Sequence, residues 1–84
     1  MNIEFEKAVE VIERCDREHP TGPVVYIDID EDDGIYDVHM ELPINNVMFI
    51  YEHLAAPMSI SADELYNAVV SRFESFGEDL NDMN

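Results

Sequence analysis

The sequence predicts an α+β fold, in which an N-terminal helix, an antiparallel β-hairpin and a C-terminal helix form one small domain. Apolar residues recur every three or four positions near both ends of the chain, which is the spacing of a helix with one buried face. In the middle of the chain, apolar and polar residues alternate instead, as they do along a half-buried strand. Since 84 residues support a single core, we expect one domain over residues 1–84, with both helices packed on one face of the sheet.

The first helix is predicted over residues 3–18. Asn2 can cap its N-terminus, and Pro20 ends it, because proline pushes the preceding residue out of the helical region. On the outer face, Glu10 and Arg14 are four residues apart in the order that favours an ion pair. We expect the apolar face to be the core face, and its members are Phe5, Ala8, Val9, Ile12 and Cys15.

The middle of the chain is predicted to form the hairpin. Two strands, 24–30 and 35–42, flank the turn 31–34, whose Asp33-Gly34 step is a strong hairpin signal that requires a positive φ at glycine. Alternation places the apolar side chains on the core face and the polar ones outside. The outward-facing residues are Tyr26, Asp28 and Asp30 in the first strand, and Asp37, His39 and Glu41 in the second.

Residues 43–57 fit two different structures. The apolar run 47–51 is long enough for a third strand, which would extend the sheet beyond the hairpin. Ile50 and Leu54 also fit the buried face of a short helix, and Pro43 is unfavourable inside a central strand. We favour the short buried helix and keep the third strand as the alternative.

A second long helix is predicted to begin after Ser61. Ser61 and Glu64 have the spacing of a capping box, in which each side chain bonds to the other's backbone amide. Gly77 suits the end of this helix because glycine adopts the left-handed conformation at little cost, and residues 78–84 are expected to form a frayed tail. The expected core face comprises Leu65, Ala68, Val69, Phe73 and Phe76.

Charge is the most unusual property of the composition. The chain has 20 Asp and Glu residues against 4 Lys and Arg, which gives a formal net charge of −16. Seven of the carboxylates lie within residues 24–42, which contain neither lysine nor arginine. Such a charge distribution attracts basic surfaces and repels phosphate backbones and anionic membranes. We therefore expect a basic protein as the partner, with no direct binding of nucleic acid or membrane.

Residue patterns of enzymes and metal sites do not occur in the sequence. There is no phosphate-binding glycine loop, nucleophile elbow or Cys-x-x-Cys pair. The acidic turn does not fit a calcium loop, since Gly34 at the sixth position would put Met40 at the twelfth, where glutamate is needed. His39 is expected to be a surface residue, and Cys15 a buried one whose free thiol fits a reducing cytoplasm. We therefore expect no catalysis, metal or cofactor, and a cytoplasmic protein.

The acidic hairpin is the candidate partner-binding surface. Alternate residues of a strand are about 6.6–6.8 Å apart, close to two rises of a DNA strand at about 3.4 Å. Carboxylates at this spacing can imitate phosphates for a nucleic-acid-handling protein, and Tyr26 can serve as an aromatic anchor. A solvated face that only aids solubility is the alternative. The candidate residues are Tyr26, Asp28, Asp30, Asp32, Asp33, Asp37 and Glu41.

In size, charge and layout the chain is similar to small acidic phage proteins that block host nucleases. This resemblance implies a nucleic-acid-mimic inhibitor of a nuclease, a restriction or CRISPR effector or a DNA-binding protein, with a role in counter-defence. The residues leave a second function open. The apolar run 47–51 can exceed what a small core buries, and it would then form the interface of a homo-oligomer or adaptor module.

Overall fold

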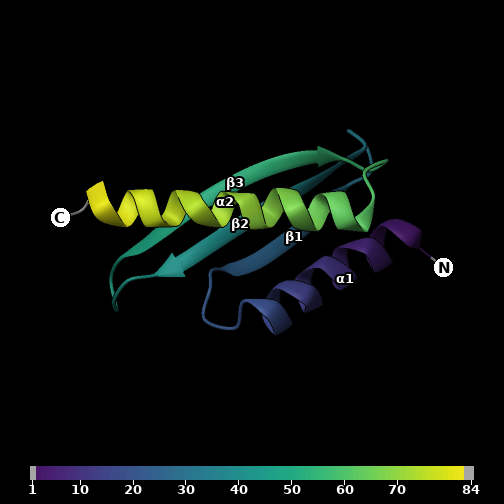
Figure 1. The fold of residues 1–84 in the computed structure, drawn as a ribbon. Helices are drawn as coiled ribbons and strands as arrows, with labels where there is room; N and C mark the ends of the chain where they lie inside the picture. The colour runs from purple at the N-terminus through teal and green to yellow at the C-terminus, as the bar shows by residue number, and fades with distance from the viewer. Residues whose placement is uncertain (1, 83–84) are drawn as a thin grey trace.

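The computed structural model describes residues 2–82 and confirms the α+β fold (Figure 1). Along the chain it comprises α1 (Ile3–Glu18), β1 (Val24–Asp30), β2 (Ile35–Pro43), β3 (Phe49–Pro57) and α2 (Ala62–Asp82). The strands form one antiparallel sheet in the order β1-β2-β3, so β2 is the central strand. Within residues 2–82, neither helix combines the length and apolarity that crossing a membrane requires.

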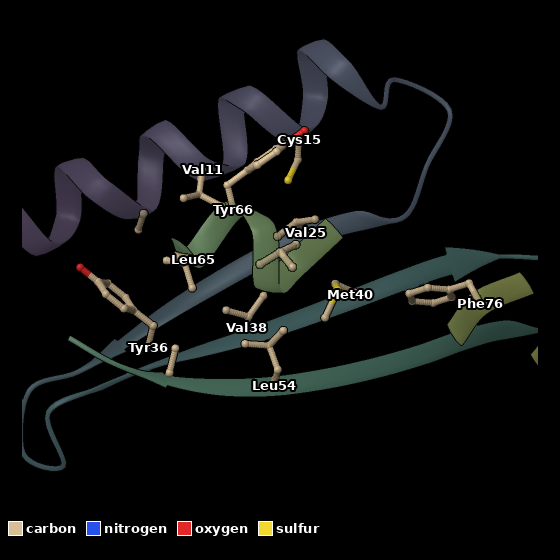
Figure 2. Close-up of a cluster of buried hydrophobic side chains, with 13 residues drawn as sticks. Val11, Cys15, Val25, Tyr36, Val38, Met40, Leu54, Leu65, Tyr66 and Phe76 are labelled. Carbon is tan, nitrogen blue, oxygen red and sulfur yellow. The ribbon is translucent and has the colours of Figure 1, made fainter. Parts of the chain in front are cut away.

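The core lies between the two helices and one face of the sheet. Three residues that alternate along β2, namely Tyr36, Val38 and Met40, have no exposed surface. Figure 2 shows Val38 and Met40 on the side of the sheet where Val11 of α1 and Leu65 of α2 also lie. Because β2 pairs with a strand on each side and contributes these buried side chains to the core, it joins the sheet to both helices.

The predicted hairpin is confirmed by the pairing of β1 with β2. The register places Asp28 directly opposite Asp37, so both carboxylates lie on the outward face. Gly34 in the connecting turn has φ +67°, the left-handed conformation that the Asp-Gly step predicted. The carboxylate of Asp30 accepts a 3.1 Å hydrogen bond from the backbone amide of Asp33, which fixes the turn.

The expected short helix within residues 43–57 is wrong, because this segment contains β3. Pro43 does not interrupt the sheet, since it is the last residue of β2. Leu54 alternates into the core as a strand residue should, and the charged residue Glu52 lies on the same side of the sheet but is only partly buried. Glu52 is tolerated on the helical side of the sheet because the guanidinium of Arg72 in α2 lies 3.4 Å from its carboxylate. Because Glu52 points inward, the sequence of this strand lacks the regular alternation of apolar and polar residues that identifies a strand.

α1 spans the predicted residues, but its core face is rotated from the predicted one. Asn2 caps the helix as expected, and its side chain accepts a 3.1 Å hydrogen bond from the amide of Phe5. Phe5 itself is 58% exposed and does not belong to the core, which corrects the sequence prediction. The buried residues of α1 are Ala8, Val11 and Cys15.

Two polar contacts explain the rotation of α1. The hydroxyl of the buried Tyr36 donates a 2.9 Å hydrogen bond to the carbonyl oxygen of Glu4. The ammonium group of Lys7 donates to the carbonyl oxygens of Met58 at 2.7 Å and Ile60 at 2.9 Å. Both contacts satisfy polar groups that would otherwise be buried without partners, so they hold this side of the helix against the sheet.

The predicted start of α2 is confirmed. Ser61 Oγ accepts a 3.1 Å hydrogen bond from the amide of Glu64 and donates one of 3.0 Å to its carboxylate. The buried residues that follow agree with the predicted core face except for the addition of Tyr66. Those residues are Leu65, Tyr66, Val69 and Phe76, with Ala68 and Phe73 partly buried.

Gly77 does not end α2, contrary to the sequence prediction. The helix continues to Asp82, so residues 78–82 of the expected tail are helical, and residues 83–84 lie outside the described part of the chain. Phe76 next to this glycine is buried, and Leu80 continues its apolar stripe one turn later. Phe76 packs in the core, and this tertiary packing outweighs the local preference of glycine for a helix end.

Gly77→Ala should therefore stabilise the fold. A Cβ atom at this position would meet no atom within 4 Å, and alanine loses less conformational entropy in a helix interior. We expect the free energy of unfolding in urea to rise by about 0.5–1 kcal/mol. Gly34→Ala is the control, because φ +67° should make the same change cost about 1–2 kcal/mol. Destabilisation by Gly77→Ala would mean that this glycine ends the helix after all.

Candidate protein-binding surface on the sheet

The sheet has one face that no helix of the described residues 2–82 covers. Side chains alternate along each strand, and those on the helical side make up the core, whereas those on the other side are exposed or half-buried. We term this second side the open face. Its main members are Val24, Tyr26, Asp28 and Asp30 of β1; Ile35, Asp37, His39 and Glu41 of β2; and Phe49, Tyr51 and His53 of β3.

Carboxylates gather at the end of the open face that adjoins the β1–β2 turn. Asp28 and Asp37 are direct cross-strand partners, and Asp30 follows Asp28 along β1. Asp32 and Asp33 are exposed in the turn itself. We term this group the acidic end, and it comprises Asp28, Asp30, Asp32, Asp33 and Asp37. The structure thus brings together five of the seven predicted site residues.

The two remaining predicted residues lie farther along the face. Glu41 lies opposite Val24 on β1 and Tyr51 on β3, two rows from the acidic end. It lies on the same open face as predicted, but apart from the five carboxylates of the acidic end. Tyr26 lies opposite His39, between Glu41 and the acidic end, and is 51% exposed. An anchor role for Tyr26 is compatible with this exposure.

Aromatic residues gather at the opposite end of the open face, which adjoins the β2–β3 turn. Phe49 is 60% exposed and Tyr51 is 46% exposed, although both are large apolar side chains. The sequence suggested neither as a member of this surface, because their placement depends on β3. We term the pair of Phe49 and Tyr51 the aromatic end.

Lysine and arginine side chains all belong to the helices. The four residues are Lys7, Arg14 and Arg17 in α1, and Arg72 in α2. Arg14 forms ion pairs with Glu18 at 3.1 Å and with Asp63 of α2 at 3.0 Å, rather than with the predicted partner Glu10. Among residues 2–82, no lysine or arginine forms an ion pair with the carboxylates of the open face.

Two histidines separate the acidic end from the aromatic end. His39 and His53 are cross-strand partners, with ring centroids 5.0 Å apart. His39 Nε2 lies 3.4 Å from the carboxylate of Asp28, and its Nδ1 bonds to the hydroxyl of Tyr51. His53 Nε2 lies 3.0 Å from the carboxylate of Asp37.

These contacts place a histidine beside two carboxylates of the acidic end. Asp28 and Asp37 each have a histidine partner that adds a positive charge when it is protonated. The turn residues Asp32 and Asp33 have no such partner within residues 2–82.

Groups suited to metal binding or nucleophilic chemistry do not converge on this face. Among residues 2–82, no three His, Cys, Asp or Glu side chains are arranged to hold a metal ion. Cys15 lies in the core with 2% of its surface exposed, and burial raises the pKa of its thiol to about 11. This cysteine is therefore a protonated core residue at neutral pH.

A second concave region lies at the other end of the molecule from the β1–β2 turn. It is a groove of about 410 Å³ between the α1–β1 loop and the last turns of α2, lined by His19, Leu42, Phe73, Phe76 and Leu80 among others. His19 bonds to the hydroxyl of Tyr66 at 3.1 Å, so its ring is already engaged. The lining of the groove is mainly apolar, with Glu18 and Thr21 as further polar members, and the open face remains the stronger candidate.

Comparison of the chain with known protein families, with curated proteins and with solved structures gave no match.

The pairing of two carboxylates across the sheet predicts that Asp28→Asn stabilises the fold. The change removes the repulsion between Asp28 and Asp37 and should raise the free energy of unfolding by up to about 0.5 kcal/mol. Urea unfolding measures the difference, with Glu74→Gln on α2 as the control. A lower stability of Asp28→Asn would show that the contact with His39 outweighs the repulsion.

Proposed function

We propose that the protein is a non-catalytic acidic binding protein that occludes the basic, nucleic-acid-binding surface of another protein. The observation that carries this proposal is that the open face exposes carboxylates but carries no lysine or arginine. Every lysine and arginine lies on the helices, while the open face presents carboxylates to solvent. A nuclease, a restriction or CRISPR effector, or a DNA-binding protein has the complementary surface.

The spacing of the carboxylates supports mimicry of a phosphate backbone. Asp28 and Asp30 are alternate residues of β1, about 6.6–6.8 Å apart by strand geometry, and Asp37 lies on the neighbouring strand about 4.7–4.9 Å away. A partner that places lysine and arginine along phosphates can meet several of these carboxylates at once. Opposite charges of this kind accelerate association and exclude partners of the wrong sign.

Rigidity of the surface also supports the proposal. Asp28 and Asp37 are held by the ladder between β1 and β2, and the turn is held by the contact between Asp30 and Asp33. No lysine or arginine must be displaced from these carboxylates before a partner binds. A preorganised surface keeps more of its interaction energy as affinity, since little entropy is lost on binding.

The proposed setting is the cytoplasm, because the buried Cys15 is a free thiol, as is usual in reducing compartments. The similarity to small acidic phage proteins suggests counter-defence as the biological role. In that role the protein would act as a stoichiometric decoy without turning over a substrate.

A competition assay tests the proposal. The protein is titrated into purified nucleases and DNA-binding proteins that hold a fluorescent DNA, and release of the DNA is measured at increasing salt. We expect release at low salt that weakens as salt screens the charges. A variant that neutralises Asp28, Asp30, Asp32, Asp33, Asp37 and Glu41 should lose roughly a hundredfold in affinity, at about 0.5 kcal/mol per charge.

The matched control neutralises six exposed carboxylates of the helices and has the same net charge. These are Glu6, Glu10, Glu13, Asp16, Glu74 and Glu78. Its affinity should stay within a few-fold of the wild type, because these groups lie off the open face. Equal losses in both variants would show that only net charge matters. Binding that ignores salt, or that survives neutralisation of the open face, would contradict the mechanism.

A second candidate function is an oligomerisation or adaptor module, and one observation favours it. Val47 is 86% exposed and Phe49 is 60% exposed, so much of the apolar run 47–51 is not buried in the monomer. In this case the acidity would serve only solubility. Sedimentation at increasing concentration would then show self-association that Phe49→Ser abolishes, and a monomer at every concentration would exclude this candidate.

A further inference from the structure

The aromatic end and the acidic end are parts of one continuous surface. Glu41 lies between Val24 and Tyr51 across the sheet, and Tyr26 lies one row closer to the acidic end. Aromatic rings and carboxylates therefore project from the same side of the same three strands. An exposed aromatic cluster beside a charged group is the usual composition of an interface, in which a few aromatic anchors supply most of the energy.

The β2–β3 turn beside the aromatic end is exposed but well ordered by hydrogen bonds. The side-chain oxygen of Asn45 accepts from the amides of Val47 at 2.9 Å and Met48 at 3.1 Å. The amide of Ile44 donates to the carbonyl oxygen of Met48 at 2.9 Å. These bonds hold the turn in one shape although Val47 and Met48 are exposed, so the turn presents a fixed apolar edge.

The charge of the open face indicates which kind of partner can bind to it. A second copy of the chain would bring carboxylates such as Glu41 against other carboxylates, and the open face has no lysine or arginine to separate them. An anionic membrane is repelled for the same reason. A basic protein surface that also exposes aromatic side chains is complementary to both groups on the open face. Its cations would contact the carboxylates, and its aromatic rings would contact Phe49 and Tyr26.

We infer that the open face binds a cationic protein surface that carries exposed aromatic side chains, the composition of surfaces that bind single-stranded nucleic acid. Such surfaces combine a positively charged groove with aromatic rings on which bases stack. Tyr26, Phe49 and Tyr51 take the place of the bases, and the acidic end takes the place of the phosphates. This inference rests on the proposed function and narrows its partner from basic surfaces in general to those with aromatic platforms.

Two synthetic peptides of equal length and charge test the inference. One alternates arginine with tryptophan and the other alternates arginine with serine. Isothermal titration at low salt should show that the wild-type protein binds both, with the arginine–tryptophan peptide about three- to tenfold tighter. The double variant Tyr26→Ser, Phe49→Ser should lose this preference and keep its affinity for the arginine–serine peptide.

The matched control is the double variant Ile3→Ser, Phe5→Ser on α1. Its two apolar side chains are 63% and 58% exposed, close to the exposure of the pair on the open face. This control should keep the full preference for the arginine–tryptophan peptide. Thermal melts of both variants check that each remains folded, as expected for exposed positions.

Four other outcomes of these experiments would each contradict a specific claim. Equal binding of both peptides to the wild type would overturn this inference and leave the proposed function in place. Binding of neither peptide would overturn the proposed function itself. Loss of the preference in the α1 control would place the aromatic contact on α1. Self-association of the wild type through Phe49, seen by sedimentation, would show that a second copy covers the aromatic end.

Discussion

Burial of β2 against both helices is the interaction on which the rest of the structure depends. Tyr36, Val38 and Met40 have no exposed surface, and they project to one side of the sheet because strand residues alternate. Both helices lie on that side (Figure 1), and within residues 2–82 no helix covers the other side of the three-stranded sheet. The open face follows directly from the way in which the core is built.

Three of the four lysine and arginine side chains connect secondary-structure elements on the helical side of the sheet. Lys7 joins α1 to the segment after β3, Arg14 joins α1 to Asp63 of α2, and Arg72 joins α2 to β3 through Glu52. The guanidinium of Arg14 also lies 3.8 Å from the centre of the Tyr66 ring. Because three of the four cations have these structural contacts, the charge of the open face remains uncompensated except by its histidines.

The sequence predicted those elements whose formation depends on residues that are close together in the chain. The hairpin followed from its alternation and from Gly34, and the start of α2 followed from Ser61. β3 was kept only as the alternative to a short helix, since the inward Glu52 interrupts the apolar alternation and its compensation by the distant Arg72 is not visible in the sequence.

The same contrast applies to the candidate surface. The acidic end could be predicted from the hairpin, because its members lie on two adjacent strands and one turn. The aromatic end and the contact between His53 and Asp37 could not, because they require the register of β2 with β3. The rotation of α1 likewise depends on the distant Tyr36 hydroxyl.

Backbone NMR shifts of the labelled protein, recorded while an arginine-rich peptide is added, test the central claim most directly. If the open face is the binding surface, the shifts that change will belong to β1, β2, β3 and the turn 31–34, and those of α1 and α2 will stay constant. Changes concentrated on α1 and α2, or spread evenly over the chain, would contradict the claim that the open face is the binding surface.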